Sequence, residues 1–120
     1  MTQAAADARF DCKACGKEAA RIQLFGDPAR GGKLQRVSFT SVLSNPVSAA
    51  GFDSLRAVIA AHDPRALYAL DLELASFYCP KCDACYCGEH WKSWSVYDDD
   101  GWHDSIRGAC PSGHERMLED

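Results

Sequence analysis

Two stretches in the first third of the chain alternate apolar and polar residues. The alternation covers residues 20–24 and again residues 34–43, and it is typical of strands with one buried face. Between them, Gly26-Asp27-Pro28 and Gly31-Gly32 interrupt the pattern with residues that favour turns. We therefore predict a β-hairpin with a mobile loop in this region.

The middle of the chain predicts a short helix. Asn45-Pro46 ends the hairpin unit, and Asp53 is a suitable N-cap for the helix that follows. Leu55, Val58 and Ile59, together with His62, fall on one face of this helix. The pair Asp63-Pro64 stops it.

The segment after this stop has two interpretations. Alternation from Tyr68 to Leu74 predicts a strand. Alternatively, Asp63 caps a second helix with Pro64 at its first position, which continues to about Leu70, and the strand begins only afterwards.

The last third predicts a second hairpin. Trp94, Val96 and Tyr97 form one arm, the segment 98–101 supplies an Asp-Gly turn, and residues 102–107 form the other arm. Residues 115–118 then have the composition of a short terminal helix.

Length and composition predict one soluble domain. The chain has 120 residues, of which 47% are hydrophobic and 25% charged, and its longest apolar runs fall far short of a membrane span. Residues 1–9 lack the pattern of a secretory signal, so we expect a disordered tail followed by a single domain at 10–120, with residues 17–78 as an insertion. This composition favours a cytoplasmic protein. A net charge of −4 disfavours binding to nucleic acid through a basic surface.

The seven cysteines are spaced as metal ligands rather than as a disulfide framework. Cys12 and Cys15 are separated by two residues, and so are Cys79 and Cys82. Two further cysteines are each followed by a histidine at a ligand distance, in Cys87-Gly88-Glu89-His90 and in Cys110-Pro111-Ser112-Gly113-His114. Eight ligands make two tetrahedral zinc sites of three sulfurs and one nitrogen.

The short gap between Cys82 and Cys87 decides which pairs share an ion. Each closely spaced ligand pair forms a short turn, a zinc knuckle, and the four knuckles are numbered in chain order. Four residues separate Cys82 from Cys87, too few for the second and third knuckles to wrap one ion from opposite sides. We therefore pair the first knuckle with the third and the second with the fourth. Site one is Cys12, Cys15, Cys87 and His90, and site two is Cys79, Cys82, Cys110 and His114. Each structural ion contributes on the order of 10 kcal/mol to folding.

This ligand order resembles the cross-brace zinc fingers, the group that contains RING, PHD, FYVE and B-box domains. The segment from Cys79 to His90 is closest to the PHD and FYVE spacing. The order of knuckle, hairpin and a last ligand pair at a helix start also resembles a treble clef. The resemblance implies a small α+β domain and a possible docking role in ubiquitin-like conjugation. The chain departs from the group in the 63 residues between Cys15 and Cys79 and in its last pair, which ends in histidine.

The remaining cysteine and histidines give little support to catalysis. Cys85 lies among the ligands and competes with Cys82 or Cys87 for a place, although we expect a free buried thiol. His62 and His103 are interpreted as ordinary surface or packed side chains. Both inferred metal sites are full, whereas a catalytic zinc needs an open position.

Aromatic residues around the second hairpin suggest a partner surface. Trp91, Trp94 and Trp102 either build the core or, beside Asp99, form an aromatic anchor with an acidic rim for a basic peptide or protein. The sequence thus favours a protein-interaction module with structural zinc. A nucleic-acid binder, the first alternative, requires six basic residues on one face: Lys13, Lys17, Arg21, Arg30, Lys33 and Arg36. The second alternative is a metal-dependent enzyme.

Overall fold

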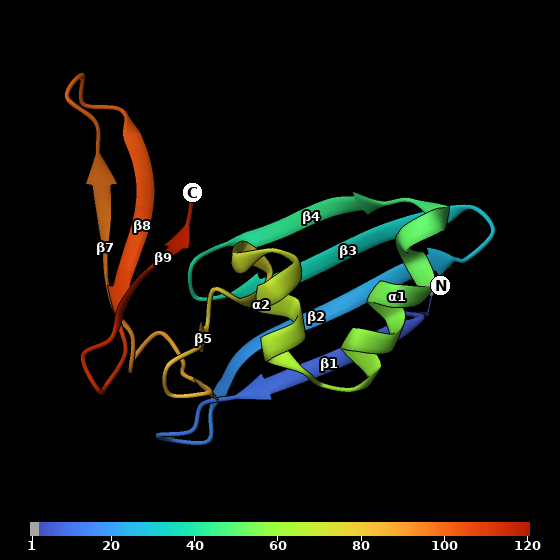
Figure 1. Ribbon diagram of the computed structural model, residues 1–120, viewed down its shortest axis with the longest axis horizontal. Helices are drawn as coiled ribbons and strands as arrows, with labels where there is room; N and C mark the ends of the chain where they lie inside the picture. Colours follow the sequence, from blue (N-terminus) through green and yellow to red (C-terminus); the bar gives the residue numbers. More distant parts are fainter. Residues whose placement is uncertain (1–2) are drawn as a thin grey trace.

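A four-stranded antiparallel sheet forms one side of the molecule, and a smaller three-stranded sheet stands apart from it (Figure 1). The structure is a computed structural model that describes residues 3–120. The strands of the larger sheet lie in chain order: β1 (Ala6–Asp11), β2 (Glu18–Asp27), β3 (Gly31–Ser38) and β4 (Val42–Val47).

Two helices cover one face of this sheet, α1 (Ala49–Ala60) and α2 (Pro64–Leu70) (Figure 1). The Ser48 hydroxyl caps α1 by accepting a hydrogen bond from the Gly51 N–H at 3.2 Å. Asp63 caps α2, whose first residue is a proline with no N–H to satisfy. The fully buried side chains that fill the space between helices and sheet are Ile22, Leu24, Leu34, Phe52, Ile59 and Leu67.

The C-terminal part consists of short elements. A 3-10 helix, η1 (Leu72–Ala75), leads into two two-residue strands, β5 (Tyr78–Cys79) and β6 (Ala84–Cys85). The three-stranded sheet follows and comprises β7 (Lys92–Tyr97), β8 (His103–Ala109) and β9 (Glu115–Glu119), in that order.

A buried arginine joins the larger sheet to the chain's C-terminal strand. The Arg36 side chain is fully buried, and its guanidinium donates to the hydroxyls of Ser38, Thr40 and Ser41 at 2.9–3.0 Å. It also donates to the Ser76 hydroxyl. Ser41 in turn donates to a Glu119 carboxylate oxygen at 2.6 Å, and this carboxylate lies 3.8 Å from the guanidinium. The charge is therefore satisfied only when both parts of the chain are in place.

Arg116 on β9 makes a second connection. Its guanidinium lies 5.0 Å from the centre of the Tyr68 ring on α2. It donates to the backbone carbonyls of Leu72, Ala75 and Tyr78 at 3.0, 2.8 and 2.7 Å. Arg116 therefore fixes the backbone immediately before Cys79.

Several predicted boundaries in the N-terminal half are wrong. Residues 6–9, expected in a disordered tail, belong to β1, where Phe10 pairs with Ala20 and Ala6 with Leu24; residues 1–2 of that tail lie outside the described residues. The predicted strand at 34–43 is two strands, β3 and β4, with a turn between them. Pro46 does not end the unit, because an edge strand such as β4 tolerates a residue without an N–H.

Three further predictions concern helices. The first helix begins after Ser48 rather than at Asp53. Residues 64–70 form the helix that the second interpretation predicted. The strand predicted from Tyr68 to Leu74 is wrong, because these residues belong to the end of α2 and to η1. Residues 115–118 form a strand paired with β8, so the helix expected after the last ligand of a treble clef is not present.

The second hairpin is confirmed, with Val96 opposite Ser105 across β7 and β8. The mixture of sheets and two helices agrees with the α+β class. Within residues 3–120, no helix has the length and apolar character needed to cross a membrane.

Candidate metal centres

The first cluster joins the start of the chain to its last third. Cys12 follows β1 directly, and the Gly16 N–H donates to the Cys12 carbonyl at 2.8 Å to close a tight turn. Gly16 has a φ of 79°, which favours glycine, and it lets the chain return to β2. The opposite knuckle is closed by the His90 N–H, which donates to the Cys87 carbonyl at 3.0 Å.

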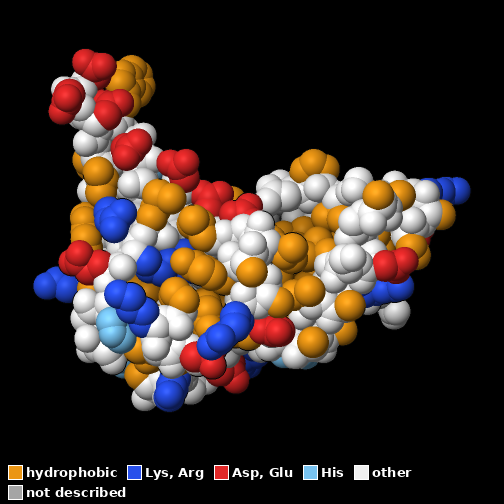
Figure 2. All heavy atoms as spheres, viewed as in Figure 1, with side chains coloured by type: hydrophobic (Ala, Val, Ile, Leu, Met, Phe, Trp, Pro, Cys, Tyr) orange, Lys and Arg blue, Asp and Glu red, His pale blue; other side chains and the backbone are white. Residues whose placement is uncertain are grey.

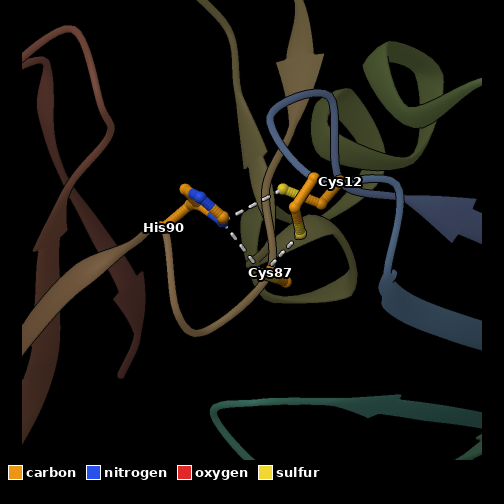
Figure 3. Close-up of side chains that lie close together, drawn as sticks. Cys12, Cys87 and His90 are labelled. Carbon is orange, nitrogen blue, oxygen red and sulfur yellow. Dashed lines mark hydrogen bonds between the residues drawn. The ribbon is translucent and has the colours of Figure 1, made fainter.

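The ligand atoms of these knuckles converge on one point. Figure 3 shows Cys12 from the start of the chain directed toward Cys87 and His90, which lie on one loop of the last third. His90 Nδ1 lies 3.6 Å from Cys12 Sγ and 3.3 Å from Cys87 Sγ. Cys15 Sγ lies 3.7 Å from Cys87 Sγ. An exposed ion pair between Lys17 and Glu89, at 3.1 Å, also spans the two knuckles.

The second cluster lies within the C-terminal part. His114 Nδ1 lies 3.7, 3.3 and 3.4 Å from the sulfurs of Cys79, Cys82 and Cys110. Cys82 Sγ and Cys110 Sγ are 3.7 Å apart. Two sulfurs accept backbone hydrogen bonds at 3.4 Å, Cys79 from the Cys82 N–H and Cys110 from the His114 N–H. Such bonds stabilise thiolates.

These distances fit one tetrahedral ion in each cluster. With zinc–sulfur bonds of about 2.3 Å and zinc–nitrogen bonds of about 2.0 Å, a tetrahedron separates sulfurs by about 3.8 Å and sulfur from nitrogen by about 3.5 Å. All ligand atoms in each cluster lie within 4.8 Å of one another. The two groups, each of three cysteines and one histidine, can therefore hold metal ions, consistent with structural zinc.

The grouping of the ligands is the one that the spacing predicts. Cys12, Cys15, Cys87 and His90 form one cluster, and Cys79, Cys82, Cys110 and His114 form the other. Cys12 and Cys15 meet Cys87 and His90 because the turn after β1 lies against the end of β6, where the Lys13 N–H donates to the Cys85 carbonyl at 2.8 Å.

Local hydrogen bonds favour the metal-binding form of some thiols. Hydrogen bonds from the hydroxyls of Tyr86 and Ser112 lower the pKa of Cys82 to about 6. Burial acts to raise the pKa of Cys12, but backbone N–H groups, that of Cys87 foremost, outweigh it and lower the value to about 7. The thiolate is the form that binds a metal, so these hydrogen bonds favour ligation by Cys82 and Cys12, whereas burial raises the pKa of Cys79 to about 11.

A family comparison covers the same residues. The family model described as a domain of unknown function, DUF8328, matches residues 2–120. The chain belongs to the DUF8328 family. The DUF8328 match includes all eight ligands of the two clusters and the larger sheet. No curated protein and no solved structure matches the chain.

The other candidate residues lie outside both clusters. Burial raises the pKa of Cys85 to about 12, so its thiol stays protonated. His62 follows the exposed end of α1, and the His103 ring packs edge-on against Tyr97 with centroids 5.8 Å apart. Neither histidine belongs to a ligand group.

The predicted partner surface needs one correction. Trp91 is only 3% exposed, its Nε1–H donates to the Phe77 carbonyl at 3.0 Å, and its ring packs edge-on against Tyr86. It therefore belongs to the core. Trp94, Trp102 and Asp99 are exposed.

The six basic residues do not form a free basic face. Arg36 is buried in its hydroxyl network, Arg21 pairs with Asp7 at 2.6 Å, and Lys17 pairs with Glu89. This arrangement removes half of the cations on which a nucleic-acid interface would depend.

A cavity of about 150 Å³ lies beside the second cluster, lined by Tyr68, Cys79, Pro80, Lys81, His114, Glu115 and Arg116. Two of these residues are ligands. Because four protein ligands complete a tetrahedral ion, no coordination position is left there for a substrate or a reactive water.

The structural roles of Arg36 and Arg116 were not predicted: Arg36 was considered only as one of six surface cations, and Arg116 was not considered. Arg116 donates to the carbonyl of Tyr78, next to the ligand Cys79. Nothing in the spacing of either arginine distinguishes it from a surface cation.

Proposed function

We propose that this domain is a protein-interaction module in which two structural zinc ions position a docking hairpin. Both ligand sets are complete and of the type that binds structural zinc. The ions stabilise a part of the chain with few buried hydrophobic residues, and the β7–β8 hairpin emerges from that part (Figure 1).

The observation that carries the proposal is the exposed aromatic tip of this hairpin. We call residues 97–102 the hairpin tip. Trp102 is 74% exposed and Tyr97 is 61% exposed, although side chains of this size are usually largely buried. Figure 2 shows hydrophobic and acidic side chains side by side at the far end of the projecting arm.

Hydrogen bonds and a glycine define the conformation of the turn. Asp98 Oδ1 accepts hydrogen bonds from the N–H groups of Asp100 and Trp102 at 3.0 and 2.9 Å. Gly101 has a φ of 85°, which the turn requires. The exposed residues Asp99 and Asp100 thus lie in the same hydrogen-bonded turn as Trp102.

This chemistry suits a partner segment rich in lysine and arginine. A cation gains energy over an indole face and from nearby carboxylates, and the gain increases when the contact excludes water. A RING-like role in ubiquitin-like conjugation is a narrower version of the same proposal. The tip gives no reason to prefer a conjugating enzyme over other basic partners.

The test is a fluorescence titration of the zinc-loaded protein with a peptide of alternating lysine and arginine, with a glutamate peptide of equal length as a control. We expect saturable binding of the basic peptide only, weakened at least about tenfold by Trp102→Ala. The matched control is Leu70→Ala on α2, a 59% exposed residue far along the chain from the tip. Equal binding by Trp102→Ala and the unsubstituted protein would contradict the proposal.

A further inference from the structure

The outer edge of β7 is an unprotected pairing edge. β7 hydrogen-bonds to β8 on one side, and in the strand order β7-β8-β9 its other side has no neighbour among residues 3–120. Five of its six residues are exposed, and Val96 is half-buried. Trp94 is 38% exposed. The row of backbone N–H and C=O groups along such an edge is a template for another strand.

The other edges of the two larger sheets are protected. β1 alternates buried residues with charged ones, and Asp7 on it is engaged by Arg21 of β2. β4 carries Pro46, which cannot donate to an added strand. β9 ends in Glu119, which lies in the buried Arg36 network. Unlike these three edge strands, β7 has no proline, no ion pair within the described part of the chain, and a single charge at Lys92.

The sequence of β7 is complementary to itself. In an antiparallel pair centred on Ser95, Trp94 of one copy lies opposite Val96 of the other, and Lys92 lies opposite Asp98. Two-fold symmetry makes each of these contacts twice. Aromatic–β-branched pairs and pairs of opposite charge are both favourable between neighbouring strands.

We propose that two copies of this chain associate through their β7 edges, antiparallel and centred on Ser95, to form a continuous six-stranded sheet. The pairing supplies backbone partners to an edge that otherwise faces solvent and places Trp94 against an apolar side chain. Trp102 lies at the start of the other arm of the hairpin, so the dimer presents two tips at opposite ends of the joined strands. This inference does not depend on the proposed basic partner.

The test is sedimentation equilibrium of the full metal-loaded chain at increasing concentration. We expect a monomer–dimer equilibrium for the unsubstituted protein. Ser95→Lys should weaken dimerisation by at least about tenfold, because it places two cations opposite each other at the symmetry axis. The matched control is Ser44→Lys, which adds the same charge at an exposed serine on the edge strand β4 and should leave dimerisation unchanged.

A second variant keeps the test valid if Ser95→Lys fails to fold. Lys92→Glu changes an exposed side chain and brings it opposite Asp98 of the other copy, so it should also favour the monomer. Circular dichroism and metal content identify folded variants. A protein that stays monomeric throughout the concentration series overturns the proposal, and so does a dimer that is insensitive to both folded variants.

Discussion

The two halves of this domain are stabilised by different means. Residues 3–77 form the larger sheet and its helices, with fully buried side chains such as Phe52, Ile59 and Leu67 between them. Residues 78–120 contribute few large buried hydrophobic residues, among them Trp91 and Leu118, but supply six of the eight ligands. Metal ions therefore add to the small share of the hydrophobic core that this part of the chain contributes.

The two clusters differ in which parts of the chain they connect. Every ligand of the second cluster lies between Cys79 and His114, so that ion organises the C-terminal half locally. The first cluster joins Cys12 and Cys15 to Cys87 and His90 and thereby ties the two halves together. Each cluster therefore has its own expected consequence when its ion is lost.

The largest expected effect comes from removing the second ion. Cys110→Ser should destabilise the C-terminal half by up to the order of 10 kcal/mol and make the amides of β7, β8 and β9 exchange rapidly. Amides of β2 and β3 should remain protected longer, because the hydrophobic core stays in contact with them. Hydrogen exchange with mass spectrometry measures both regions together.

The control is Cys85→Ser, since Cys85 belongs to neither cluster. It should leave metal content unchanged. Uniform loss of protection across both halves of Cys110→Ser would show that the domain is one cooperative unit and that its halves are not stabilised separately.

A substitution in the hydrophobic core should lower stability without removing metal. Phe52 is fully buried on α1, and Phe52→Ala should lower the free energy of unfolding by about 3–5 kcal/mol. Urea denaturation measures this loss. Native mass spectrometry should still count two ions in the folded variant, and a loss of metal would show that the core and the clusters are not separable.

The junction between the halves should be sensitive to the buried charge. Arg36→Met leaves four hydroxyl groups without their donor and should cost about 3 kcal/mol in urea denaturation. Arg56→Met is the matched control, because Arg56 is only half-buried, pairs with its helical neighbour Asp53 and otherwise contacts the Phe52 ring of the same helix. Equal free energies of unfolding for the two variants would show that the buried Arg36 does not stabilise the contact between the two halves.

The smallest effect is expected at the hairpin tip. Trp102→Ala should change the free energy of unfolding by no more than about 0.5 kcal/mol, because the ring is 74% exposed. Thermal denaturation followed by circular dichroism measures this change. A much larger loss would mean that the ring stabilises the fold instead of being available to a partner.

Features that depend on local sequence pattern were predictable, and features that depend on distant contacts were not. Ligand grouping depends on residue type and spacing, and both are visible in the chain, so the clusters were predictable. Alternation predicted β2, and the Asp-Gly turn between two arms predicted the β7–β8 hairpin. Residues 115–118 favour a helix locally, yet pairing with β8 makes them a strand, which shows tertiary contacts overriding propensity.

Burial of charge was not predictable. Arg36 occupies a polar position in an alternating strand, but it is fully buried because hydroxyls of the 38–41 turn and of the distant Ser76 surround it. Alanine-rich β1 gave too weak an apolar signal to distinguish a strand from a tail. Both features depend on contacts between distant parts of the chain.

Native mass spectrometry of the purified protein, which counts bound metal directly, tests the central claim that two ions hold this domain together. We expect two zinc ions per chain, with one or none after Cys87→Ser. A chain that folds with no bound metal, or one that keeps both ions after this substitution, would contradict the account.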